Sequence, residues 1–205
     1  MANARRAERY VTKTKMKKHS PSPSRLIPHV KLLSVATLLV AVLTSCVSTQ
    51  REPGFVSLFD GKTLAGWTLV GKHGAGYGVT NGVIYCAPGG GGDLLTDQEF
   101  DDFILRFEFK LEDGSNNGIG IRAPLGGDVA YLGMEIQILE DGAADRGKWG
   151  KLHAEQYHGS IYGVVAAKRG ALKPPGEWNT EEITAQGRQI KVVVNGKTIV
   201  DANLN

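Results

Sequence analysis

The sequence is short of cysteine and of aromatic residues, which make up 7% of its 205 residues. The two cysteines, Cys46 and Cys86, cannot supply the disulfide framework of a small exported scaffold. The apolar run at residues 32–43 is shorter than the roughly 20 residues that span a membrane as a helix. No window shows the apolar repeat of an amphipathic helix longer than two or three turns. These absences argue against a disulfide scaffold, a membrane-spanning helix and a helical bundle.

The front of the chain has the pattern of an export signal. Residues 1–31 carry nine Lys/Arg and one acid, Glu8, and the apolar run and two small residues follow. A basic segment, a short apolar segment and small residues before a cleavage site are typical of a secretory signal peptide. Met16, followed by two lysines, would be a more typical start for such a peptide.

The segment Leu43-Thr-Ser-Cys46 resembles the bacterial lipobox, in which the cysteine becomes the acylated first residue of the mature protein. We therefore predict a lipoprotein signal peptide at residues 1–45 and a linker at residues 46–54. Lipid chains on Cys46 would hold the protein at a membrane surface without spanning it. The expected location is the bacterial cell envelope, in the periplasm or at the outer membrane. Cys86 is then left without a disulfide partner and is expected as a small buried strand residue.

Removing the leader reverses the sign of the charge. The full chain is formally +3, but residues 46–205 carry fifteen Lys/Arg and twenty Asp/Glu, which gives about −5. No basic stripe remains, so the sequence gives no support for nucleic-acid binding. The length of this part suits a single domain, at residues 55–205.

Alternating segments separated by glycine turns predict an antiparallel β-sandwich. All 27 glycines follow the leader, and turn signals recur every ten to fifteen residues. Residues 103–112 alternate apolar and charged side chains, which is typical of a strand with one face in a core. Residues 190–194 lead into Asn195-Gly196, a strong hairpin signal. Many short strands with glycine-rich turns indicate a sandwich or a barrel.

Two of the predicted strands carry unusual polar residues. In residues 133–140 the apolar side chains alternate with Glu135 and Gln137, which share the opposite face. A carboxylate and an amide side by side are an odd choice for a face that is only solvated. The strand is therefore a candidate wall of a site for a polar ligand.

The second such strand is at residues 116–122. There, Gly118, Gly120 and Arg122 face away from the two isoleucines. Glycine weakens a strand and usually marks the close approach of a ligand or of another backbone. We expect these residues and the acidic strand to meet at one site.

Six motifs in order resemble the bacterial 3-keto-disaccharide hydrolase domain family, which is related to 3-keto-glycoside lyases and hydratases. They are SLFDGKTLAGW, DLLTDQEFDDFILRFEFKL, NNGIGIRAP, GMEIQILED, GSIYG and GEWN. The resemblance runs from Phe55 to the last residue and implies a concanavalin A-like jelly roll. Family members usually continue for several strands past the hairpin at Asn195. We therefore expect a sandwich that is incomplete at its C-terminal end and lacks a closing strand.

The resemblance implies a substrate that is a glycoside already oxidised to a ketone at sugar carbon 3. Elimination from such a sugar needs a base at carbon 2, a stabilised enolate and an acid for the leaving oxygen. Glu135 is the expected base, and Arg122 is the expected group that polarises the ketone or pairs with Glu135. Gln137 is expected to orient sugar hydroxyls. Hydration of the eliminated product would give net hydrolysis.

Residues 156–162 form a second polar cluster. If they form a strand, His158, Ser160 and Tyr162 share one face. His158 is the candidate general acid, or a metal ligand together with Glu135. The chemistry accommodates a divalent metal ion, but no zinc-site spacing is matched. The further candidates for substrate contact are Tyr131 and Trp178, which would stack on a sugar ring, together with Tyr162 and Lys168.

Two other functions stay open at this point. One is a carbohydrate-binding sandwich without catalysis, because this fold hosts both classes. The other is an ordinary glycosidase that uses two carboxylates. Glu135 and Glu140 have opposite parity on one strand and would not flank one bond, which argues against this function, although another acid such as Asp128 could supply the pair.

Overall fold

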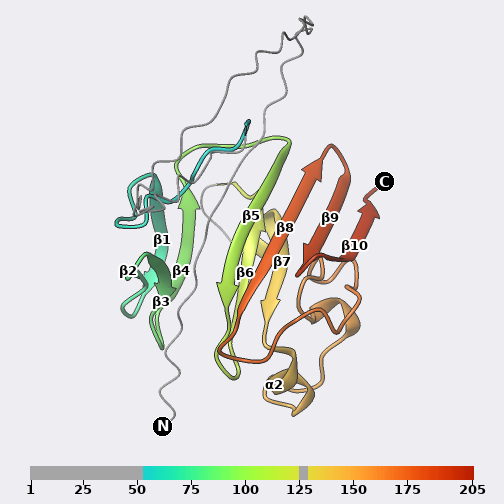
Figure 1. The fold of residues 1–205 in the computed structure, drawn as a ribbon. Coiled ribbons are helices and arrows are strands. Elements are labelled where there is room, and N and C mark those ends of the chain that lie inside the picture. The colour runs from blue at the N-terminus through green and yellow to red at the C-terminus, as the bar shows by residue number, and fades with distance from the viewer. Residues whose placement is uncertain (1–52, 125–128) are drawn as a thin grey trace, which may run out of the picture.

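The computed structural model describes residues 53–124 and 129–205 (Figure 1). The regular structure in these ranges is almost all strand, with ten strands and only short helices. None of the described helices is both long and apolar enough to cross a membrane. The predicted signal peptide, Cys46 and Asp128 lie outside the described residues, as does most of the predicted linker.

Four antiparallel strands form the larger sheet, in the order β10-β9-β8-β5. Their bounds are β5 Phe103–Lys110, β8 Trp178–Gln186, β9 Gln189–Val194 and β10 Lys197–Asn203. The strand predicted from alternation at residues 103–112 is confirmed as β5. Phe107 and Phe109 of this strand are buried, whereas Glu108 between them is not fully buried. One face of the sheet therefore lies on the core, as the alternation requires.

The predicted hairpin at Asn195-Gly196 is also confirmed. Both residues have positive φ, 50° and 79°, and Val194 of β9 pairs with Lys197 of β10. Two positive φ angles define the turn whose twist matches the flanking strands, and Asn-Gly adopts it readily. Asn81 and Gly82 repeat this geometry between β2 (Tyr77–Thr80) and β3 (Val83–Cys86).

The second layer of the sandwich is built on the antiparallel pair β6 (Asn116–Ile121) and β7 (Met134–Leu139). Ile161 forms a bridge to Ile136 of β7 on the side away from β6. Short helices α1 (Val129–Leu132) and α2 (Asp141–Asp145) flank β7 in the chain, and a 3₁₀ turn at Ala154–Gln156 follows. The core between the two layers is apolar and is made of Phe107, Phe109, Leu111, Ile121, Ile136, Ile138, Ile161, Ile183, Ala185, Ile190, Val192, Val194, Ile199 and Val200.

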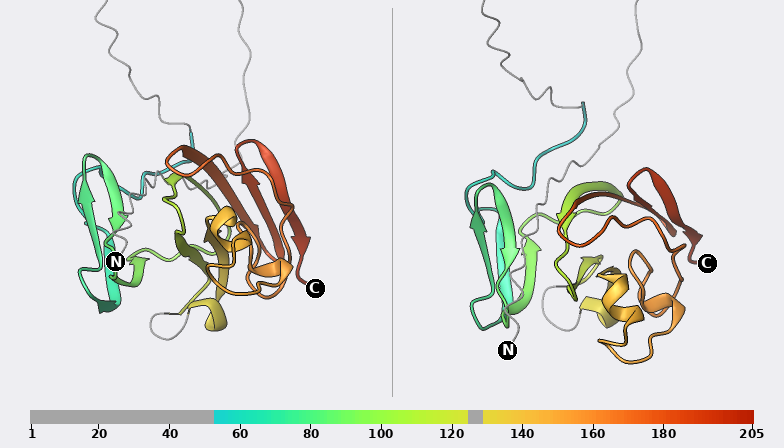
Figure 2. Two further views of the ribbon diagram at one scale, coloured as in Figure 1. Left: turned by 90° about the horizontal axis from the view of Figure 1, so that it is seen from below. Right: turned by 60° about the horizontal axis from the view of Figure 1, so that its bottom comes forward.

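The first strands of the domain lie beside this sandwich. β1 (Trp67–His73) pairs with β4 (Gly91–Thr96), and β2 and β3 form a separate hairpin. Both views in Figure 2 set this group apart from the larger sheet. Tyr77 Oη and the Asn117 side chain amide lie 3.3–3.4 Å apart and link the two parts. The predicted antiparallel β-sandwich is confirmed, with sheets that remain open on the side of β4.

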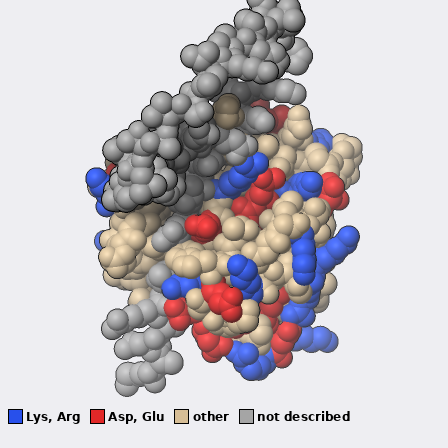
Figure 3. All heavy atoms as spheres, in the orientation of Figure 1, with Lys and Arg blue, Asp and Glu red and all other residues tan. Residues whose placement is uncertain are grey.

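Charge on the surface is mixed rather than segregated. On the face seen in Figure 3, Lys and Arg side chains are interspersed with Asp and Glu. Examples among the described residues are the pairs of Arg146 with Asp113 and of Arg169 with Asp145. Exposed pairs of this kind contribute little to stability, about 0–1 kcal/mol each.

Candidate functional site

A cleft of about 1210 Å³ separates the first strands from the sandwich. Strands β1 and β4 form one wall, and β6 with part of β5 forms the other. Glu135 of β7 and Arg122, which directly follows β6, both line this cleft. The two residues that the sequence placed first among the candidates therefore reach the same space.

Glu135 lies over the glycines of β6, as predicted. The register pairs Gly120 with Glu135 and Gly118 with Gln137. A Cβ atom added to Gly118 would overlap the Glu135 Oε1 atom and lie 2.5 Å from Glu135 Cγ. The carboxylate therefore occupies the space that any other residue at position 118 would fill. The sequence signal for this contact was the glycine on the face opposite the isoleucines.

Tyr162 holds the backbone of the candidate base. Its N–H donates to the Glu135 carbonyl oxygen at 2.9 Å, and its hydroxyl accepts a hydrogen bond from Gln156 Nε2 at 2.8 Å. Tyr162 does not line the cleft. Its described role is to fix β7 rather than to contact a ligand.

Arg122 is in the cleft wall, but its guanidinium is directed toward the β8–β9 turn. It donates to the Gly187 carbonyl oxygen and lies 3.3 Å from Asp102 Oδ1. Asp102 also accepts the Gly187 N–H at 2.7 Å. Arg122 has φ of 54°, a left-handed conformation that is uncommon for residues other than glycine. This backbone conformation ends the alternation of the strand at Arg122. The expectation that Arg122 shares a face with Gly118 was based on that alternation.

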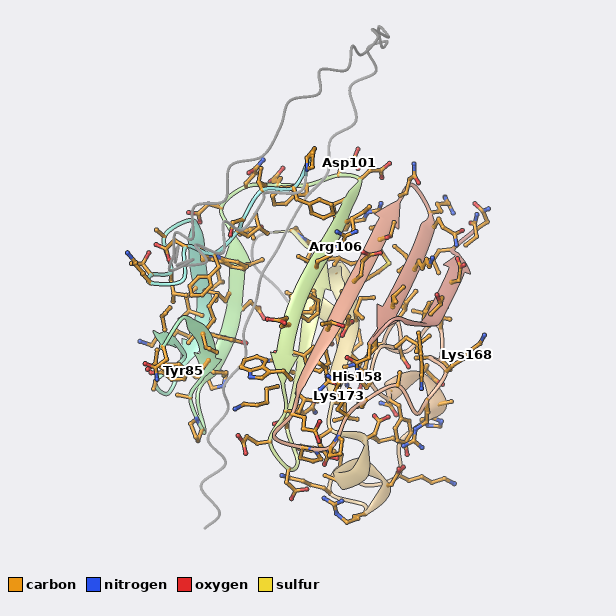
Figure 4. All side chains as sticks on the ribbon, viewed as in Figure 1. Tyr85, Asp101, Arg106, His158, Lys168 and Lys173 are labelled. Carbon is orange, nitrogen blue, oxygen red and sulfur yellow. The ribbon has the colours of Figure 1, made fainter. Side chains whose placement is uncertain are left out.

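His158 lies in the core, on the opposite side of β7 from Glu135. The Phe109 ring is 5.2 Å from its ring, and its Nε2 atom is 3.5 Å from Glu181 Oε2. The two side chains are 2% and 0% exposed. Leu139 N–H donates to His158 Nδ1 at 3.3 Å, whereas His158 Nε2 has no hydrogen-bond partner among the described residues. Figure 4 labels His158 in the region where the two layers overlap in this view.

The segment around His158 is not the strand that would have aligned it with Tyr162. Gly159 has φ of 74°, and within the segment only Ile161 forms β-bridges. Ser160 is buried, and its hydroxyl accepts the Ala167 N–H at 3.0 Å. The general-acid role predicted for His158 needs access to a ligand, and its burial in the core argues against that role.

Gln137 shares the Glu135 face of β7 but is only 5% exposed. Its Oε1 atom has no hydrogen-bond partner among the described residues. Burial at this level separates it from the sugar hydroxyls that it was expected to orient.

The remaining predicted contacts lie outside the cleft. Tyr131, on α1, is 79% exposed, and Lys168 is also exposed, projecting outward in Figure 4. Trp178 is the first residue of β8, and its side chain lies on the opposite face of the strand from that of the buried Asn179. Lys110 Nζ is 5.4 Å from the centroid of the Trp178 ring. None of these three side chains lines the cleft.

Glu140 has a structural role, in agreement with its parity. Its carboxylate accepts N–H hydrogen bonds from Gly142 and Ala143 at 2.8 and 2.7 Å and caps α2. It also accepts the Gly114 N–H at 3.2 Å. A carboxylate at a helix start satisfies amide groups that have no partner within the helix.

The acids beside Glu140 are likewise paired. Arg169 donates to Asp145 Oδ2 at 2.6 Å and to Asp141 Oδ2 at 3.5 Å. The hydrogen bond from Arg169 holds the pKa of Asp145 below its ordinary value, and the same bond raises the pKa of Arg169. No group of three or more metal-binding side chains is present in residues 53–124 and 129–205.

Sequence reasoning missed the polar groups of the far wall and the buried acid. His73, Asp93 and Tyr77 line the cleft opposite β6. Only the tertiary arrangement brings them there, so no local pattern marks them. The burial of Glu181 could have been predicted, because Glu181 is two residues from Ile183 on one strand and therefore shares its core-facing side.

Residues 54–205 match the family described as the 3-keto-alpha-glucoside-1,2-lyase-like domain. The chain belongs to this family. A 3-keto-disaccharide hydrolase from Bacteroides thetaiotaomicron is 29% identical over 189 residues, which are 82% of this chain and 65% of that protein. The chain therefore spans just under two thirds of the length of this 3-keto-disaccharide hydrolase.

Solved structures of two putative glycosyl hydrolases from Parabacteroides distasonis are similar to this lyase-like domain. One is 27% identical with a TM-score of 0.53, covering 67% of this chain and 72% of that one. The other is 23% identical with a TM-score of 0.59, covering 73% and 71%. The second likeness concerns the fold alone. Together with the strand order, these likenesses confirm the predicted jelly-roll sandwich for the 3-keto-alpha-glucoside-1,2-lyase-like domain.

Proposed function

We propose that this chain cleaves the glycosidic bond of 3-keto-glycosides and that Glu135 is the base that removes the proton at sugar carbon 2. The observation that carries the assignment is the Glu135 carboxylate, which lies over Gly118 in the wall of the cleft. Family membership and the name of the Bacteroides thetaiotaomicron relative support the substrate class.

The proposed reaction is an elimination followed by addition of water. The ketone acidifies the proton at carbon 2, and Glu135 accepts that proton while the enolate forms. As the ketone is restored, the bond from carbon 1 to the leaving oxygen breaks, and that oxygen takes up a proton. Water then adds its proton at carbon 2 and its hydroxyl at carbon 1, which gives net hydrolysis. Acid–base transfer of this kind contributes a factor of roughly 10²–10⁴.

The other roles are assigned by position in the cleft. Arg122 is the candidate group for the enolate oxygen, because it is a cation in the cleft wall and donors stabilise developing negative charge. Its guanidinium, which binds Gly187 and Asp102 in this structure, would have to turn toward the ligand. His73, in the far wall, replaces His158 as the candidate acid for the leaving oxygen, because His158 is buried. The carbohydrate ligand would thus lie between β6 and the first strands.

We also propose that the leader exports the protein and that acylated Cys46 anchors it to the cell envelope. The support is the basic segment, the apolar run and the lipobox-like residues 43–46. An anchored enzyme would meet sugars outside the cytoplasm.

The test of the substrate class compares a 3-keto-disaccharide with its unoxidised parent. We expect the protein to consume only the oxidised sugar, followed by chromatography of both sugars over time. The Bacteroides thetaiotaomicron relative, assayed in parallel, shows that the oxidised substrate is competent. Equal consumption of both sugars would instead indicate an ordinary glycosidase. Binding of the oxidised sugar without turnover, while the relative cleaves it, would indicate a carbohydrate-binding module.

Replacing Gly118 by Ala should lower kcat/KM without unfolding the protein. The added Cβ would overlap the Glu135 carboxylate, which must then swing away on its flexible side chain. A displacement of about 1 Å in a catalytic group can cost roughly 100-fold in rate. Thr198→Ala is the control, because Thr198 is exposed on β10 and does not line the cleft. Unchanged kcat/KM in Gly118→Ala would show that the position of this carboxylate does not matter.

A further inference from the structure

His73, the candidate acid in the far wall of the cleft, lies across a glycine of the neighbouring strand. The register pairs His73 of β1 with Gly91 of β4. A Cβ atom added to Gly91 would lie 2.5 Å from His73 Cε1 and 2.6 Å from His73 Nε2, closer than such atoms come in proteins. The imidazole therefore occupies the space that a side chain at position 91 would fill. Glu135 lies over Gly118 in the same way on the other wall.

A bulge in β1 directly precedes His73. Two residues of β1, Gly71 and Lys72, lie opposite the single residue Gly92 of β4. Gly71 has φ of 61°, the left-handed conformation that a glycine adopts in a common type of bulge. An extra residue bends the strand and redirects the side chains beside it, and bulges of this kind are frequent next to active sites. The direction of the His73 side chain is therefore set by the backbone of β1.

The glycines on either side of Gly91 serve a different purpose. A Cβ atom on Gly90 would lie 2.6 Å from the Gly76 N atom, and one on Gly92 would lie 2.7 Å from the Val70 carbonyl oxygen. These glycines allow two backbones to approach each other. At Gly91 the three nearest atoms all belong to the His73 ring, and its φ lies outside the left-handed range. Gly91 is thus the position where a methyl group would displace the ring and leave the backbone in place.

The His73 ring is accessible to a ligand. The residue is exposed and lines the cleft. Its Nδ1 atom is 3.4 Å from the Gly71 carbonyl oxygen, which leaves Nε2 for a ligand. A glycine weakens a strand, so a histidine that is only solvated gives no reason for one beneath it.

A ring over a strand glycine can also be purely structural, because it stabilises the sheet. The same packing occurs between β2 and β3, where Gly78 is paired with Tyr85. A Cβ atom on Gly78 would lie 2.7 Å from the Tyr85 hydroxyl oxygen. Neither of these two residues lines the cleft. The Gly78–Tyr85 pair is therefore the internal reference for a structural role.

We propose that Gly91 is a positioning residue that seats the His73 imidazole for protonation of the leaving oxygen. This inference rests on the proposed cleavage of 3-keto-glycosides and adds the residue that fixes the acid. As the bond from carbon 1 breaks with its electron pair on the leaving oxygen, that oxygen takes the proton from Nε2 of the protonated ring. The neutral ring regains a proton from solvent, to which Glu135 releases the carbon 2 proton, so the protons balance over the cycle.

The test compares a leaving group that needs a proton with one that does not. The second sugar of a 3-keto-disaccharide leaves as an alkoxide unless it is protonated, whereas 4-nitrophenolate is a stable anion. Gly91→Ala should lower kcat for the disaccharide by roughly 10- to 100-fold, because a displacement of about 1 Å has effects of this size. It should leave kcat for a 4-nitrophenyl 3-keto-glucoside nearly unchanged. His73→Phe keeps a ring over Gly91 and should show the same selectivity with a loss of roughly 10²–10⁴.

Two comparisons separate positioning from a structural role. In the His73→Phe background, Gly91→Ala should cause no further loss of kcat, because a positioning residue acts through the side chain that it seats. Gly78→Ala displaces Tyr85 in the same manner outside the cleft and should keep kcat for both substrates. Full kcat in Gly91→Ala, equal losses on both substrates, or additive losses in the double variant would overturn the proposal.

NMR of the histidine rings tests the seat without catalysis. Among the signals of the five histidines, those of His73 are assigned by their absence in His73→Phe. Gly91→Ala should shift the His73 ring signals, and unchanged signals would overturn the seat. If Gly91→Ala does not fold, His73→Ala in the same chain should restore folding, and failure to do so would also contradict the seat. An unmodified protein that cleaves neither substrate would refute the proposed function, whereas the ring signals would still decide the role of Gly91.

Discussion

Replacing Glu135 by Gln should reduce kcat for a 3-keto-glycoside by a factor of roughly 10²–10⁴, the usual contribution of a general base. The amide keeps the shape of the side chain over Gly118 but cannot accept a proton from carbon 2. KM should change little, because binding through the rest of the cleft is retained.

Glu177→Gln is the matched control for this result. It makes the same chemical change at an exposed carboxylate outside the cleft. Circular dichroism and the midpoint of thermal unfolding should be the same for both variants and the unmodified protein. If Glu135→Gln kept full kcat while folded, another group would have to be the base.

Removing one partner of the buried pair His158–Glu181 should lower the free energy of unfolding by about 3–5 kcal/mol. Both side chains are almost fully buried, and neither Glu181 oxygen has a hydrogen bond within the described residues. His158→Leu would leave the carboxyl group alone in the apolar core. Glu181→Leu would leave the polar ring of His158 buried without the carboxyl group that lies 3.5 Å from its Nε2 atom. Urea unfolding of the two single variants measures the cost.

The double variant His158→Leu/Glu181→Leu separates a pair from two independent losses. Replacing both members of a buried polar pair by apolar residues is often neutral or stabilising. We therefore expect the double variant to be more stable than either single variant. If a single variant fails to fold, soluble expression of the double variant gives the same information. Single costs that add in the double variant would mean that the two side chains act separately.

Local patterns in the sequence predict the strands and turns that depend on neighbouring residues. Alternation in residues 103–112 indicates β5, and Asn195-Gly196 indicates the hairpin with its positive φ angles. The position of Glu135 over the glycines also follows from the alternation, because each residue of a strand can point to only one of two faces. These features need no knowledge of the tertiary fold.

The failures occur where a single residue breaks the period. Arg122 and Gly159 both have positive φ. This backbone conformation interrupts the strand geometry, so side chains near these residues do not point where a period of two would place them. The Arg122 guanidinium accordingly binds near Gly187, and His158 turns into the core toward Glu181. The cleft itself could not be predicted, because its walls come from strands that are distant in sequence.

The most direct test of the account is the fate of the carbon 2 hydrogen during cleavage of a 3-keto-disaccharide in D₂O. Elimination with Glu135 as base, followed by hydration, predicts deuterium at carbon 2 of the product from the first turnovers, detected by NMR. Uncatalysed exchange is subtracted with substrate and product incubated without the protein, and Glu135→Gln should show no incorporation above it. Cleavage that leaves the original hydrogen on carbon 2 would contradict the mechanism.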